Sequence, residues 1–326
     1  MSARSTTGGA GQGEDIDLVL LRDHLVSIAL RAGRMITSAR PSTSSSGTKK
    51  NSADLVTETD QAVEAFISSE LRTLYPGFSF MGEETYQPGQ TLGPEPTFVV
   101  DPIDGTTNFV HRFPYVSVSL GFAVDRVPSV GVVYNPFTGR LYTGVKGKGS
   151  FVFDVPAGAG AAGAGDLTAP PRPEQGTKLP TKELTALGGL DGCVVAVEFG
   201  SDRSGRNWKT KTDTWARLGR SKDDGGAMVH SARALGSAAL NLCGVAEGVL
   251  DAYWEGGCWA WDVCAGWVIL TEAGGLIVDG NPSGNFDIPV THRKYLAVKA
   301  AKDGVGQKEL VKEFWSHIEG DMVYEH

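Results

Sequence analysis

The run Asp101–Phe109, Asp-Pro-Ile-Asp-Gly-Thr-Thr-Asn-Phe, constrains the fold of this chain more than any other feature. It follows the apolar residues 98–100, a pattern that predicts a buried strand ending in carboxylates. Carboxylate oxygens are the ligands that hard divalent cations prefer. If a helix begins in the Gly-Thr-Thr turn, its backbone N–H groups can face a phosphate. The run therefore predicts a place where cations and a phosphate meet, which is typical of phosphoryl chemistry.

The composition is that of an ordinary globular protein. Of 326 residues, 41% are hydrophobic and 21% are charged, enough for one large domain or two lobes. The net charge of -8 argues against a general nucleic-acid binder. No apolar stretch approaches the ~20 residues that span a bilayer, and residues 1–14 lack the apolar segment of a signal peptide. We therefore expect no nucleic-acid or membrane partner and a cytoplasmic location.

The cysteines show no spacing typical of zinc sites or disulfide frameworks. Two of them flank Trp259 and Trp261 in an apolar stretch. We expect small buried apolar residues at all four positions. They are Cys193, Cys243, Cys258 and Cys264.

The hydrophobic pattern divides the chain into a strand-rich half and an alternating half. We predict a disordered tail (1–14), an N-terminal α+β lobe (15–190) and a C-terminal α/β lobe (191–326), with a low-complexity surface insert at 156–182. The first lobe has predicted helices at 16–38 and 59–74 and strands at 98–100, 115–124, 131–134, 141–143 and 151–153. The second has predicted helices at 231–248, 261–273 and 307–318 and strands at 194–197, 252–254, 276–278 and 296–298.

Further acidic residues stand out, but each has an ordinary structural explanation when taken alone. Asp60 and Asp262 lie near the starts of predicted helices, where an acid commonly caps the first turn. Glu83–Glu84 follows an apolar run and could be a solvated loop. Asp101 and Asp104 could stabilise a turn. Only the combination of these residues is specific.

That combination resembles the inositol monophosphatase family. The runs that carry the resemblance are Gly82–Thr85, Asp101–Phe109 and Trp261–Gly266 with Thr271–Gly275, in the family's order. The match extends from about the first predicted helix to the last and leaves out the tail and the insert. It implies an α/β (α+β) protein with the layered α-β-α-β-α sugar-phosphatase fold and a site between the two halves.

The resemblance also implies a magnesium site with two to three ions. The first ion would lie on Glu83, Asp101 and the backbone carbonyl of Ile103. The second would lie on Asp101, Asp104 and Asp262, and a third, well hydrated, near Glu83. Magnesium keeps several waters, so this small set of oxygen ligands suffices.

The catalytic roles that the resemblance implies fall on neighbouring residues. Thr106, oriented by Asp60, would help Glu83 to activate the attacking water, and the N–H groups of Gly105 and Thr106 would hold the phosphate. Lys49 or Lys50 would approach the metals, and the sequence does not decide between them. Since no cysteine or histidine stands in a phosphate-loop arrangement, a covalent phospho-enzyme is disfavoured.

The substrate side is implied by the segments 234–239 and 251–255, which resemble the family's polyol-binding segments. Glu255 would accept hydrogen bonds from substrate hydroxyls. Ser201 would contribute likewise. The alternative for the small residues is close packing within a helix. The residues proposed to line the pocket are Gly236, Ser237 and Ala238.

These features predict a magnesium-dependent phosphomonoesterase that hydrolyses inositol monophosphate to inositol and phosphate by direct attack of a metal-activated water. The partner would be a small sugar or polyol phosphate. The run Gly105–Phe109 and Glu255 after Tyr253-Trp254 favour the inositol branch over phosphatases of other sugar, nucleotide or histidinol phosphates. A non-catalytic regulatory homologue stays open. The resemblance also implies a homodimer and inhibition by lithium.

Overall fold

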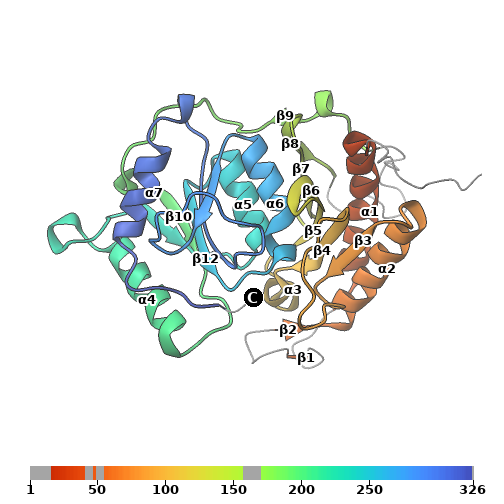
Figure 1. The fold of residues 1–326 in the computed structure, drawn as a ribbon, viewed down its shortest axis with the longest axis horizontal. Coiled ribbons are helices and arrows are strands. Elements are labelled where there is room, and N and C mark those ends of the chain that lie inside the picture. Colours follow the sequence, from red (N-terminus) through yellow and green to blue (C-terminus); the bar gives the residue numbers. More distant parts are fainter. Residues whose placement is uncertain (1–15, 41–46, 49–54, 157–169, 325–326) are drawn as a thin grey trace, which may run out of the picture.

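The computed structural model describes residues 16–40, 47–48, 55–156 and 170–324. They form five layers (Figure 1), which confirms the predicted α-β-α-β-α arrangement. The outer helices α1 (Leu18–Ser38) and α2 (Glu58–Leu74) cover a seven-stranded sheet. Next come α5 (Ala238–Glu247) and α6 (Ala260–Glu272), between the two sheets. A five-stranded sheet follows, covered by α4 (Gly205–Gly219) and α7 (Gln307–Ser316).

The seven-stranded sheet is a meander in which only the first pair of strands is parallel. Its α1–α2 face is lined by a continuous apolar cluster that includes Phe98, Val118 and Leu120. Its strands, in spatial order, are β3 (Ser79–Gly82), β4 (Thr97–Asp104), β5 (Ser117–Val124), β6 (Val127–Asn135), β7 (Arg140–Val145), β8 (Gly149–Asp154) and β9 (Thr177–Lys178).

The five-stranded sheet is mixed, with β10 parallel to both of its neighbours and β14 antiparallel to both of its own. Its order is β11 (Ser231–Arg233), β10 (Val194–Val197), β12 (Ala252–Gly256), β14 (Lys294–Val298) and β13 (Leu276–Asp279). The remaining elements are the short pair β1 (Gly47–Thr48) and β2 (Leu55–Val56), helix α3 (Thr106–His111) and four single-turn 3₁₀ segments, Pro173–Gln175, Leu190–Gly192, Lys222–Asp224 and Lys302–Gly304.

A row of glycines lets α6 lie directly on the seven-stranded sheet. Gly121, Gly131 and Gly144 are paired across β5, β6 and β7. A Cβ atom at Gly131 would lie 2.1 Å from the carbonyl oxygen of Ala265, and one at Gly121 would lie 2.6 Å from Sγ of Cys264. These contacts leave no room for a side chain, so the glycines set how close α6 comes to the sheet. The depth of α6 in turn decides where its N-terminus meets β4.

One predicted helix is wrong in part. The sequence favoured a helix over 231–248, but residues 231–233 form β11, which pairs with β10, and the helix begins only at Ala238. The Ser237 hydroxyl accepts a hydrogen bond from the N–H of Leu240 and caps the helix there. The small residues before it are compatible with a helix, so periodicity alone did not reveal the boundary.

Helix α4 was not predicted at all. Its buried positions are mainly polar, namely Thr210, Lys211 and Thr214, with Leu218 as the buried apolar residue. Its apolar residues Trp208, Trp215 and Leu218 are widely spaced among polar ones, which made the helical period easy to overlook. The other long helices, α1, α2, α6 and α7, carry an apolar stripe or are apolar throughout, and they were predicted within a few residues of their ends.

The prediction that residues 156–182 form a surface loop is wrong for the last part of this insert. Thr177–Lys178 pairs with β8, and Leu179 is buried. Residues 157–169 and the predicted tail lie outside the described residues, and the division into lobes at 190 stays a prediction. The four cysteines are buried and unpaired, which confirms their predicted role. No helix among the described residues has the length and apolar character to cross a membrane.

Candidate active site

A bulge in β4 brings Asp101 and Asp104 to the same face of the sheet. Residues three apart in a regular strand point to opposite faces. Here Asp101 pairs with Ser119 and Asp104 with Ser117, so β4 holds one more residue than β5 between the two pairs. Because the two serines are two residues apart, they share a face, and so do the aspartates opposite them. Both aspartates were singled out from the sequence, but the bulge that aligns them was not predicted.

Asp101 is 2% exposed, and its Oδ1 accepts a hydrogen bond of 3.0 Å from the N–H of Ile103. This bond curls the backbone between the two aspartates and thereby fixes the bulge. The carbonyl oxygen of Ile103 accepts from the hydroxyl of Thr106 at 3.1 Å. Burial, followed by the charges of Glu83, Asp104 and Asp262, raises the pKa of Asp101 well above its usual value.

Asp104 ties β4 to the start of α5. Its carboxylate accepts hydrogen bonds from the N–H groups of Ala238 (3.2 Å) and Ala239 (2.9 Å), and from the hydroxyls of Ser237 and Ser117. Burial raises the pKa of Asp104 to about 6, although these four donors oppose the rise. Ser237 and Ala238, predicted to line the substrate pocket, therefore contact a proposed metal ligand.

Asp262 occupies the first turn of α6, where Oδ2 accepts a 2.6 Å hydrogen bond from the N–H of Trp259. The hydroxyl of Ser119 donates to the carbonyl oxygen of Trp261 at 3.2 Å. Because Ser119 is the strand partner of Asp101, this bond holds the start of α6 beside that aspartate. Burial, then the charges of Glu83 and Asp104, raises the pKa of Asp262.

Glu83 follows directly after β3, and its N–H donates to the carbonyl oxygen of Val100 in β4 at 3.1 Å. Its carboxylate lies close enough to Asp101 for a side-chain hydrogen bond and faces the charge of Asp262. The structure thus places four acidic side chains from the β3 turn, β4 and α6 near enough to influence one another, although they are up to 179 positions apart in the sequence.

Thr106 and Asp60 are also brought together. The Thr106 hydroxyl lies 3.0 Å from Oδ1 of Asp60, which is 1% exposed at the start of α2. Oδ2 of Asp60 accepts from the N–H of Thr57 in a capping box. Burial raises the pKa of Asp60, and the charge of Glu83 adds to this, against the hydrogen bonds from Thr57 and Thr106.

Gly105 forms the left-handed turn between β4 and α3, with φ of 92°. A Cβ atom there would lie 2.9 Å from the carbonyl oxygen of Tyr115 and 3.0 Å from that of Gly236. Glycine is therefore required both for the turn and for the close approach of the segment around Gly236. Asn108 closes the same contact, because its side-chain N–H groups donate to the carbonyl oxygens of Tyr115 and Leu235.

Lys211 joins the segment that precedes Ser201 to the end of β12, which carries Glu255, whereas Gly236, Ser237 and Ala238 lie at the start of α5. The buried ammonium of Lys211 donates to the carbonyl oxygens of Phe199 (3.1 Å) and Gly256 (2.7 Å). Phe199 precedes Ser201 by two residues, and Gly256 follows Glu255. Burial raises the pKa of Glu255 to about 7, the charge of Glu198 adds to this, and Lys211 opposes it.

Glu198 is a residue of the site that the sequence reasoning missed. Its Oε1 accepts hydrogen bonds from the N–H groups of Leu235 (2.7 Å) and Gly236 (3.0 Å) and from the amide of Asn241 (2.9 Å). It thereby shapes the segment that carries Gly236. The available signal was an acidic residue directly after a buried strand, as at Asp101. Lys49 and Lys50 lie outside the described residues.

The model of the inositol monophosphatase family matches residues 17–319. This chain belongs to the inositol monophosphatase family. It is 44% identical over 280 residues to inositol monophosphatase 2 of Saccharomyces cerevisiae, covering 85% of this chain and 86% of the relative. It is also 37% identical over 306 residues to quinic acid degradation cluster protein x of Neurospora crassa, covering 86% and 84%.

Solved structures support the same assignment. The inositol monophosphatase of Anabaena (Nostoc) sp. PCC 7120 superposes with a TM-score of 0.68 at 26% identity, over 93% of this chain and 98% of that one. Family membership identifies the chain as a phosphoric monoester hydrolase of a metal-dependent family that generally uses magnesium.

The donor set of the site fits a hard cation. Burial raises the pKa values of Asp101, Asp104 and Asp262, and repulsion by neighbouring carboxylates adds to the rise for Asp101 and Asp262. No described lysine or arginine forms an ion pair with Asp101, Asp104 or Asp262, although Arg293 lies near enough to interact with the charge of Asp262. As placed, no three described Asp, Glu, His or Cys side chains are grouped as a ready coordination shell. Asp104 illustrates why, since four hydrogen bonds engage its oxygens. The chemistry fits magnesium, and the side chains would adjust to bind it.

Proposed function

We propose that this inositol monophosphatase family member hydrolyses inositol monophosphate to inositol and phosphate in a magnesium-dependent reaction. The observation that carries the proposal is the buried group of carboxylates Asp101, Asp104 and Asp262 beside Glu83. None of the three aspartates forms an ion pair with a described lysine or arginine. Such a concentration of negative charge is costly to fold unless cations offset it. The family match supplies the substrate class.

The ions, two to three, would be held by Glu83, Asp101, the carbonyl oxygen of Ile103, Asp104 and Asp262. When bound, magnesium supplies Lewis-acid stabilisation of the phosphate's negative charge and makes water a stronger nucleophile. The number of ions is part of the proposal.

The side chains around the cluster would orient the nucleophile. The Thr106 hydroxyl lies within hydrogen-bonding distance of both Asp60 and the carbonyl of Ile103, so its proton can point toward either acceptor. Its oxygen lone pair can then accept a hydrogen bond from water. The carboxylate of Glu83 would take the proton that water gives up, and the N–H groups of Gly105 and Thr106 would hold the phosphate oxygens.

The inositol ring would meet the end of β12, the segment before Ser201 and the start of α5. Glu255 would accept hydrogen bonds from ring hydroxyls, with Ser201, Gly236, Ser237 and Ala238 lining the pocket. The Glu198 carboxylate supports this, because it holds the backbone at Gly236 by accepting hydrogen bonds from the N–H groups of Leu235 and Gly236. A polyol suits such a site, since its many hydroxyls can satisfy buried acceptors.

Lithium inhibition, a homodimer and a cytoplasmic location also follow from the family resemblance and stay predictions. Lithium would compete with a magnesium ion at the carboxylates. A dimer would sediment at about twice the chain mass of 34.5 kDa.

Phosphate release from inositol 1-phosphate by the purified full chain tests the proposal. We expect turnover with magnesium and none with excess EDTA. A panel of other sugar, nucleotide and histidinol phosphates measures the substrate preference, which the name of the Neurospora relative leaves open. If phosphate were released faster from one of these esters than from inositol 1-phosphate, that ester would be the better candidate for the substrate. Metal binding without release from any ester would favour a regulatory protein.

A further inference from the structure

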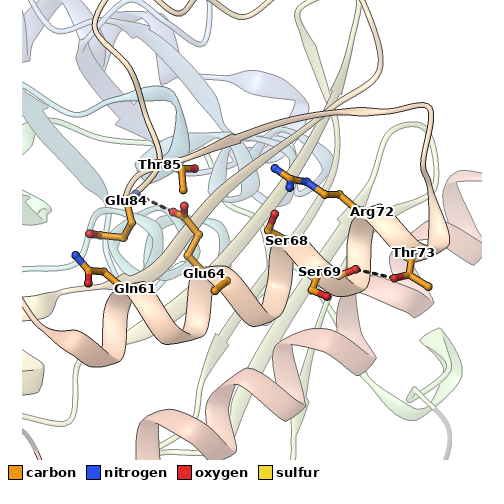
Figure 2. A pocket seen from close by; sticks show the side chains of 9 residues that line it. Gln61, Glu64, Ser68, Ser69, Arg72, Thr73, Glu84 and Thr85 are labelled. Carbon is orange, nitrogen blue, oxygen red and sulfur yellow. Dashed lines mark hydrogen bonds between the residues drawn. The ribbon is translucent and has the colours of Figure 1, made fainter.

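The turn that carries Glu83 is held from outside the sheet by one buried carboxylate of α2. Glu64 is 1% exposed, and its Oε2 accepts a 2.7 Å hydrogen bond from the N–H of Glu84 (Figure 2). The hydroxyl and N–H of Thr85 face the same carboxylate. Glu64 crosses to this turn beside a groove of about 690 Å³ between α2 and residues 84–85 (Figure 2).

The residue before Glu83 is shaped to receive this carboxylate. A Cβ atom at Gly82 would lie 2.5 Å from both Cδ and Oε2 of Glu64. Glu64 therefore touches the chain at Gly82, Glu84 and Thr85, on both sides of Glu83. On the other side of the turn, the N–H of Glu83 itself bonds to Val100 in β4. The backbone of Glu83 is thus clamped between α2 and the strand that carries Asp101.

Glu64 has no cationic partner to offset its burial, because no described lysine or arginine forms an ion pair with it. Only the N–H of Glu84 and the hydroxyl and N–H of Thr85 face its carboxylate among the described residues. A buried carboxylate that no cation offsets is costly to folding. By contrast, Glu70 on the same helix pairs with Arg31 at the surface. Residues that destabilise the fold in this way are common at functional sites.

We propose that Glu64 is a positioning residue that holds the backbone turn of Glu83 so that Glu83 can bind metal. The inference rests on the proposed function, since it assumes that Glu83 is a metal ligand. Partners that orient a metal ligand commonly change metal affinity by 10-fold or more when removed. Glu64 would therefore affect metal affinity more than the folding of the chain as a whole.

Metal binding by the full-length protein tests this directly. We expect Glu64→Ala to weaken Mn²⁺ binding, measured by isothermal titration calorimetry, by about tenfold. The magnesium concentration that gives half-maximal phosphate release should rise by a similar factor. Glu64→Gln keeps the length and an acceptor oxygen for the N–H of Glu84, so it should stay within about threefold of the unchanged protein. Glu70→Ala is the matched control on α2 and should leave both values unchanged.

Thermal unfolding in EDTA separates positioning from loss of structure. If Glu64→Ala does not fold, Glu64→Asp decides, because it keeps the charge but withdraws it from Glu84, and it should weaken Mn²⁺ binding like Ala. A folded Glu64→Ala or Glu64→Asp variant with unchanged Mn²⁺ affinity would overturn the inference. So would a loss of Mn²⁺ affinity in Glu64→Gln as large as that in Glu64→Ala. Absence of phosphate release by the unchanged protein would instead refute the proposed function, while the Mn²⁺ titration still tests Glu64.

Discussion

Three acidic residues of the site also have a local structural role. Asp101 accepts a hydrogen bond from the N–H of Ile103 within its bulge, Asp262 caps α6, and Asp60 completes the capping box of α2. The ordinary explanation of these three residues is therefore correct, and it is compatible with the functional one. The local bonds fix the direction of each side chain, which is how a site is organised before a ligand arrives. Residue types and motifs were predictable from the sequence, but these directions were not.

The Thr106 hydroxyl provides a first test at this scale. Thr106→Val removes the bonds to Asp60 and Ile103 while keeping the volume, so kcat for phosphate release should fall about 100-fold. Thr106→Ser keeps the hydroxyl and should retain most of the rate. Equal losses in both variants would show that packing, and not the hydroxyl, matters at this position.

Asp279, which is not part of the carboxylate cluster, gives a pH-dependent test of stability. Burial would raise its pKa, but the contact with His292, 2.8 Å away, and hydrogen bonds from Ser283 and the N–H of Asn281 outweigh burial and lower it. A carboxyl group whose pKa is lowered by folding stabilises the fold at any pH above its unfolded pKa of about 3.9. This stabilisation is lost as the pH falls through the folded pKa. Asp279→Asn should therefore cost about 2 kcal/mol near pH 7 in urea unfolding.

The difference in unfolding free energy between Asp279→Asn and the unchanged protein should narrow below about pH 3.9, where Asp279 takes up a proton in the unfolded chain before it does so in the folded one. A cost that stays constant from pH 7 to pH 3 would show that packing and hydrogen bonding, and not the charge, are responsible.

At the scale of elements, the position of α6 depends on the glycine row of β5, β6 and β7. The apolar pattern predicted α6 and these strands, because buried apolar periodicity is the strongest sequence signal. It did not reveal that three glycines, far apart in sequence, line up beneath the helix. Such a row becomes visible only when the strand register is known. Tertiary contacts that a sequence does not show also explain why β11 and α4 were not predicted. β11 is defined by its pairing with β10, and α4 by a buried face that is mainly polar.

Gly131→Ala tests the contact between α6 and the sheet. The added Cβ would meet backbone atoms of Ala265, which cannot move without shifting the helix. We expect a loss of about 3 kcal/mol in the free energy of urea unfolding. Gly188→Ala, where a Cβ would meet nothing within 4 Å, should change it by less than about 0.5 kcal/mol. A mild effect of Gly131→Ala would mean that α6 does not lie as close to the sheet as described.

In the whole molecule, the site lies where the seven-stranded sheet meets α5 and α6 (Figure 1). Asp104 joins β4 to α5, Ser119 joins β5 to α6, and Asn108 joins α3 to the segment before α5. The residues that would bind the phosphate and the polyol thus come from both halves of the chain. The family resemblance implied this arrangement, whereas composition and periodicity alone did not.

Anomalous diffraction from crystals soaked in Mn²⁺ tests the central claim most directly. We predict at least two manganese peaks at bonding distance from carboxylate oxygens of Glu83, Asp101, Asp104 and Asp262, with the carbonyl of Ile103 in contact with one of them. Manganese bound elsewhere, with Asp262 turned away from Asp101 and Glu83, would contradict the account.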